Sequence, residues 1–193
     1  MPSHLGVRSV VALIMLAGPS KPVTGEEAGR PAVAVQVFNH ARVPAETLTR
    51  AQAHVARIYR GTGVEVLWTD AAGTDAPGRF AIKLIIKPKA SGSRVMGTAI
   101  GDTRGAGGTA FVYRDRVLDV AHERDLVDAR VLAYAMAHEM GHLLLPYPAH
   151  ATTGMMRAEW DSEDFRHIAT GWLRFTPVQA SAIRAKASGC CGR

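Results

Sequence analysis

The chain has 193 residues, of which 47% are hydrophobic and 21% are charged, so its length and composition predict one globular domain that folds without disulfides. Lys and Arg outnumber Asp and Glu by 23 to 17, but the basic residues are scattered along the chain, and we expect no nucleic-acid partner. No apolar stretch approaches the length of a membrane span, so stable membrane insertion is not expected either.

The first twenty residues have the organisation of a secretory signal. Arg8 precedes an apolar run at residues 10–17, and small residues follow it. We therefore expect a signal peptide over residues 1–20 and a secreted or periplasmic location, with a buried first helix as the alternative. A flexible lead over residues 21–31 and a tail over residues 188–193 complete the expected organisation. The tail holds the only two cysteines, which are adjacent and imply no disulfide framework.

Residues 32–187 have the pattern of one domain in which strands precede most of the helices. Alternating or β-branched runs predict strands at residues 32–38, 64–69, 80–87, 95–100 and 109–113. Apolar residues at helical spacing, together with capping signals, predict helices at residues 44–60, 125–145, 161–168 and 177–187. The last of these begins with a capping box formed by Thr176 and Gln179. This order predicts an α/β (α+β type) fold with a mixed sheet.

The long predicted helix carries the sequence His138-Glu139-Met140-Gly141-His142. Histidines four residues apart lie on one face of a helix, where both imidazoles can bind one Zn²⁺. Glu139 follows the first histidine and is placed to act as a general base toward a water activated by the metal. Gly141 is unfavourable inside a helix, which indicates a close backbone approach beside the metal.

A catalytic zinc site needs a third protein ligand and one open position. His150 lies eight residues after His142, beyond Pro146, on a loop that can fold back toward the helix. The alternatives are Glu159, Asp161 and Glu163, which require a second ligand-bearing helix.

The stretch HEMGHLLLPYPAH, followed by TTGMM, resembles the metzincin zinc metallopeptidases, and especially their small matrixin-like members. The resemblance implies that His138, His142 and His150 are the metal ligands and that Glu139 is the catalytic base. It also implies a Met-turn at Met156, with Met155 as the second choice.

The implied fold is a twisted sheet of about five strands with one antiparallel edge strand, an active-site helix, and a C-terminal helix after the Met-turn. The sequence departs from the family pattern because its third histidine lies two residues farther along and Leu145 replaces the usual glycine.

These observations predict a secreted zinc-dependent endopeptidase, a hydrolase whose partners are peptide or protein substrates. An extended peptide can add to an exposed sheet edge, for which residues 97–100 are the candidate strand. The alternatives are a metzincin-like zinc-binding protein without turnover and a hydrolase of non-peptide amides. Three aromatic residues, Trp160, Phe165 and Trp172, are predicted to anchor the last helices in the core.

Overall fold

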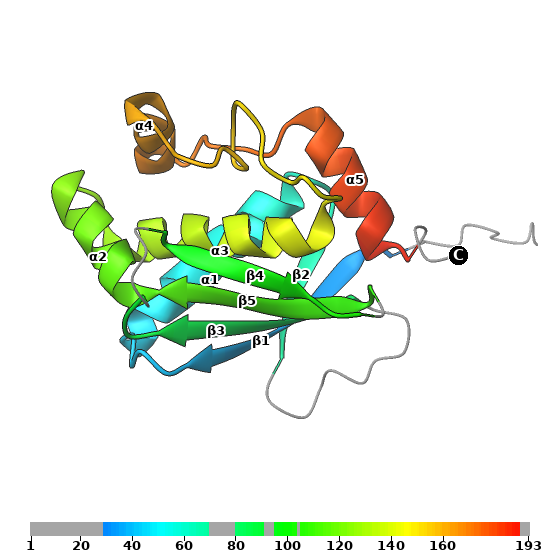
Figure 1. The fold of residues 1–193 in the computed structure, drawn as a ribbon, viewed down its shortest axis with the longest axis horizontal. Helices are drawn as coiled ribbons and strands as arrows, with labels where there is room; N and C mark the ends of the chain where they lie inside the picture. Colours follow the sequence, from blue (N-terminus) through cyan, green and yellow to red (C-terminus); the bar gives the residue numbers. More distant parts are fainter. Residues whose placement is uncertain (1–28, 70–79, 91–94, 104, 190–193) are drawn as a thin grey trace, which may run out of the picture.

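The computed structural model describes residues 29–69, 80–90, 95–103 and 105–189 (Figure 1). The predicted signal peptide and the two cysteines lie outside these residues. The elements in chain order are β1 (Ala32–Asn39), α1 (Ala45–Arg60), β2 (Glu65–Thr69), β3 (Phe80–Lys87), β4 (Gly97–Gly101), β5 (Gly107–Tyr113), α2 (Arg114–Glu123), α3 (Asp128–Leu144), α4 (Ser162–Thr170) and α5 (Pro177–Ala187).

The strands form one mixed sheet in the order β2-β1-β3-β5-β4. Strands β2, β1, β3 and β5 are parallel to one another, and β4 pairs antiparallel with β5 at the edge. The predicted α/β fold with a five-stranded sheet and one antiparallel edge strand is confirmed. The edge strand is the one expected from residues 97–100.

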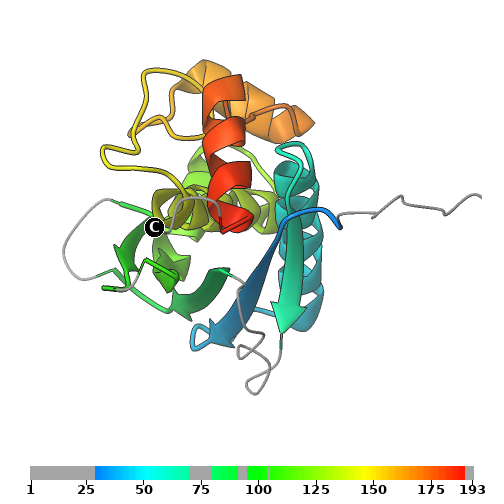
Figure 2. The same cartoon turned by 90° about the vertical axis from the view of Figure 1, so that its right-hand side faces the viewer.

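Helices α1 and α3 cover one face of the sheet, and α4, α5 and the loop between α3 and α4 lie across α3 from the sheet (Figures 1 and 2). The alternation along β3 matches this arrangement. Phe80, Ile82, Leu84 and Ile86 are buried, whereas Lys83 between them is exposed. Alternation of this kind is expected when one face of a sheet packs on a core and the other faces water.

Helix α3 lies between the sheet and the outer layer, so it is buried on nearly every side. An α-helix that is apolar all round is stable only inside a protein. The polar side chains that α3 buries, His138 and Glu139, therefore call for a specific reason.

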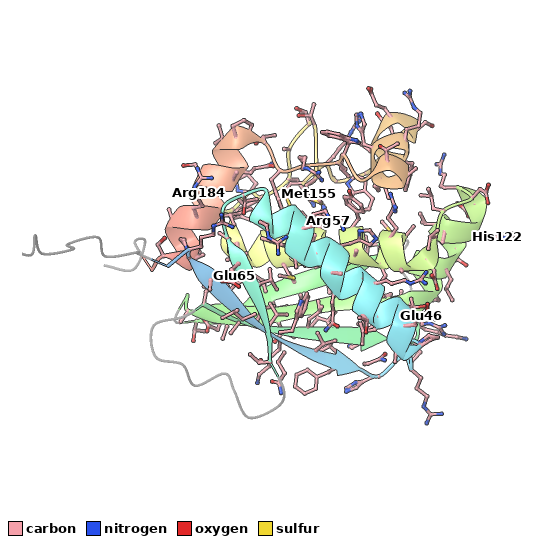
Figure 3. The ribbon with its side chains drawn as sticks, turned by 180° about the vertical axis from the view of Figure 1, so that it is seen from behind. Glu46, Arg57, Glu65, His122, Met155 and Arg184 are labelled. Carbon is pink, nitrogen blue, oxygen red and sulfur yellow. The ribbon has the colours of Figure 1, made fainter. Side chains whose placement is uncertain are left out.

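The outer layer is fixed by helix capping and by contacts with α1. Asp161 begins α4 with a capping box, and Thr176 and Gln179 form the capping box predicted for α5. Arg184 of α5 donates to the carbonyl oxygen of Thr62 at 2.7 Å, which ties α5 to the end of α1 (Figure 3). No helix among the described residues has both the length and the apolar character needed to cross a bilayer.

The structure differs from the sequence expectations at three places. Helix α2 was not predicted, although Val117 and Ala121 lie on one helical face and are buried. Strand β5 begins at Gly107 rather than at Thr109, because the two glycines pair with β3 instead of forming a turn. Trp172 is 69% exposed and does not anchor the core, unlike Trp160 and Phe165, which pack against it.

Candidate metal centre

Three imidazoles converge at the C-terminal half of α3. His138 and His142 share one face of the helix, and His150 reaches them from the loop that follows. Their candidate ligand nitrogens all lie within 4.8 Å of one another. The ring centroids are 4.8 Å apart for His138 and His142, and 4.6 Å apart for His142 and His150. The two additional residues before His150 therefore do not keep it from the other histidines.

The spacing of these nitrogens suits a zinc ion. The Nε2 atoms of His138 and His142 lie 3.1 Å apart. Two ligands bound tetrahedrally at about 2.0–2.1 Å have nitrogens about 3.3 Å apart. The three side chains form a group that could hold a metal ion, and three nitrogen donors would leave one position of a tetrahedral site without a protein ligand.

His138 is oriented by a backbone carbonyl from the outer layer. Its Nδ1–H donates to the carbonyl oxygen of Met155 at 2.8 Å. Figure 3 shows where Met155 lies. A hydrogen bond at Nδ1 leaves Nε2 without a proton and directs it to the place where the three imidazoles meet. The assignment of this tautomer follows from the carbonyl, which can only accept.

His150 is held through its neighbour in sequence rather than through its own side chain. The backbone N–H of Ala151 donates to the carbonyl oxygen of Met156 at 2.9 Å, so the loop carrying His150 closes on itself. Arg157 then joins this loop to α4 through ion pairs with Asp161 and with the buried Asp164. The side chain of His150 is therefore exposed, whereas the hydrogen bond from Ala151 holds the backbone next to it in place.

Burial keeps the two helical histidines in the neutral form. It lowers the pKa of His138, and it lowers the pKa of His142 to about 4, with the neighbouring imidazoles adding to the shift. Neutral imidazole is the form that binds metal. At neutral pH the histidines of α3 could therefore bind a metal ion without first losing a proton.

Glu139 is buried, and one of its two carboxyl oxygens has no hydrogen-bond partner among the residues that the structure describes. Its side chain is 6% exposed, and the oxygen without a described partner is Oε2. Burial raises the pKa of this carboxyl to about 8. A buried carboxyl oxygen without a partner destabilises the fold, and such groups concentrate at functional sites.

The edge strand lies directly over this carboxyl. A β-carbon built at Gly97 would lie 2.5 Å from Cγ of Glu139 and 2.5 Å from the carbonyl oxygen of Phe111. Gly97 therefore permits β4 to approach α3 closely enough to cover the Glu139 side chain.

The pKa of Glu139 predicts how pH affects the metal-free protein. The folded state holds this proton more tightly than the unfolded chain, whose carboxyl has the ordinary value of 4.5. The contribution of Glu139 to the free energy of unfolding is fully present below pH 4.5 and is lost as the pH rises toward about 8. Denaturant unfolding in a chelator, compared with Glu139→Gln across this range, should give a difference that falls with rising pH. Parallel pH profiles for the two chains would contradict this expectation.

A second close approach links α3 to the loop behind the ligands. A β-carbon at Gly141 would lie 2.5 Å from Sδ of Met156, which is completely buried. The close backbone approach predicted at Gly141 is therefore to this methionine. Met156 thus packs against the helix between the two ligand candidates, and Met155 supplies the carbonyl that orients His138.

The other predicted ligand candidates are not part of this group. Asp161 caps α4 and pairs with Arg157, and Glu159 and Glu163 are exposed. The sequence analysis did not identify the Met155 carbonyl or the contact between Gly97 and Glu139. Both connect segments that are distant in sequence, and no local pattern reveals them.

Comparison with known proteins gives likenesses in structure but none in sequence. No family model matches the chain, and no curated protein sequence matches it. The crystal structure of metalloproteinase-II from Bacteroides fragilis matches 76% of this chain at 10% identity, with a TM-score of 0.41. The match spans 54% of that protein, so this chain corresponds to about half its length.

Proposed function

We propose that this chain is an exported zinc-dependent endopeptidase, secreted or periplasmic, with His138, His142 and His150 as the metal ligands. The proposal depends on one observation: three imidazoles converge beside the buried Glu139 carboxyl, whose Oε2 atom has no hydrogen-bond partner in the described part of the chain. A purely structural zinc site has no need for a carboxyl held in this way.

The bound zinc would polarise the scissile carbonyl and make the attacking water more acidic. The chain supplies the rest of the chemistry. Glu139 accepts a proton from the attacking water and returns it to the leaving nitrogen, which makes it both general base and general acid. Met156, packed against Gly141, is proposed to form the floor of the site as the Met-turn residue.

Strand β4 is proposed as the place where a peptide substrate binds. Among the described residues it pairs with β5 alone, on one side, so its outer edge has backbone groups available for another strand. Gly97 places the beginning of this strand against Glu139, while Ile100 is 62% exposed. A peptide extended along β4 would therefore run past the carboxyl that serves as the base.

The proposal is tested by loading the purified chain with zinc and measuring metal content and cleavage of casein or a peptide library. We expect one zinc per chain and cleavage that a chelator abolishes. Zinc at one per chain with no cleavage would favour a binding protein without turnover. Cleavage of small amides but not of peptides would favour an amide hydrolase, and absence of zinc binding would overturn the proposal.

Replacing Gly97 with alanine should reduce kcat/KM by about 100-fold, because the added methyl group displaces either β4 or the Glu139 carboxyl. Zinc content should remain unchanged, since no ligand histidine contacts this position. Gly101→Ala is the matched control, because a β-carbon there meets nothing within 4 Å. Equal activity of the two variants would show that the close approach at residue 97 has no catalytic role.

A further inference from the structure

The carbonyl oxygen of Met155 accepts two side-chain hydrogen bonds, and His138 donates only one of them. The second comes from the indole Nε1–H of Trp160 at 3.3 Å. A carbonyl oxygen has two lone pairs, so this pair of donors uses both and fixes the direction in which the oxygen points. Trp160 therefore helps to hold the Met155 carbonyl oxygen in the direction that determines the tautomer of His138.

The indole ring also contacts the ligand directly. The rings of Trp160 and His138 lie edge to face, with centroids 5.7 Å apart and planes at 85°. Trp160 is held in turn by Tyr134 and Phe165, whose ring centroids lie 6.4 Å and 6.3 Å from its own, both nearly perpendicular to it. A side chain packed against two other rings is restricted in its rotation, so it can restrict the imidazole that it touches.

We propose that Trp160 is a positioning residue of the metal centre, which orients His138 through the Met155 carbonyl and through ring contact. The inference rests on the proposed function, because it treats His138 as a metal ligand. Groups that orient a ligand imidazole typically contribute about 10- to 100-fold to metal affinity. The sequence predicted only that Trp160 packs in the core. The structure shows that it also contacts the Met155 carbonyl and the ring of His138.

The test compares zinc affinity and the visible spectrum of the Co²⁺ form in the full chain and in Trp160→Phe. Phenylalanine keeps an aromatic ring and removes the N–H. We expect the Kd for zinc to rise about 10-fold or more and the cobalt absorption bands to shift. Trp172→Phe is the control, because Trp172 is 69% exposed and contacts Arg174 rather than a ligand. It should bind zinc as the unaltered chain does.

A measurement on the unaltered chain decides the matter if Trp160→Phe does not fold. Adding zinc should shift the indole N–H resonance of Trp160 and slow its exchange with solvent, while the resonance of Trp172 stays in place. Equal zinc affinity and equal cobalt spectra in Trp160→Phe and the unaltered chain would overturn this inference and leave the proposed function standing. An indole N–H resonance of Trp160 that does not change when zinc is added would have the same meaning. Failure of the unaltered chain to bind zinc would overturn the proposed function, and this inference with it.

Discussion

Replacing Glu139 with alanine should reduce peptide cleavage by about 1,000-fold while zinc stays bound. The side chain is adjacent in sequence to a ligand but lies outside the group of three imidazoles, so its loss removes proton transfer and leaves the nitrogen donors in place. The variant also removes a buried carboxyl whose pKa is raised by burial and whose Oε2 atom has no hydrogen-bond partner among the described residues. The metal-free protein should therefore unfold at a higher denaturant concentration near neutral pH.

The measurement is kcat/KM on a peptide substrate, together with the zinc content of the same preparation. Glu159→Ala is the matched control, because Glu159 is an exposed carboxylate on the loop after the ligands. If Glu139→Ala cleaved peptides at the normal rate, the base would have to be another group. If it lost zinc, Glu139 would be a ligand rather than a base.

Replacing His150 with alanine should raise the Kd for zinc by at least about 100-fold, since it removes one of three nitrogen donors. Its side chain is exposed, so the substitution leaves no cavity in the core, and the metal-free protein should be as stable as the unaltered chain. Loss of zinc would then reflect loss of a ligand rather than loss of the fold.

His122→Ala is the control for this experiment. His122 is exposed and lies in the last turn of α2 (Figure 3), and it does not belong to the group of three imidazoles. Titration with a competing chelator measures both affinities. Unchanged zinc affinity in His150→Ala would show that the third donor is a different group.

The fold could be predicted where local patterns are strong. The alternation at β3, the apolar stripe of α1 and the capping box of α5 each identified an element within a few residues of its observed bounds. Helix α2 was missed because its sequence is rich in charge and buries only Val117 and Ala121. The start of β5 was missed because glycine usually indicates a turn, whereas here it allows β5 to pair closely with β3.

The candidate site could be predicted only in part. The spacing of His138 and His142 on a helix is a local property, and the structure places both imidazoles as that spacing requires. The position of His150 depends on a backbone hydrogen bond between Ala151 and Met156, which no spacing rule contains. The environment of Glu139 depends on Gly97, forty-two residues earlier, so its burial follows from the tertiary structure alone.

The contrast between the two helical histidines and His150 has a consequence for metal exchange. His138 and His142 belong to a helix enclosed by two layers, so they cannot separate without disturbing the core. His150 has an exposed side chain on the surface loop that follows the helix. If the group binds zinc as proposed, the ion would be held most weakly on the His150 side, and this side would determine how fast it exchanges with solvent.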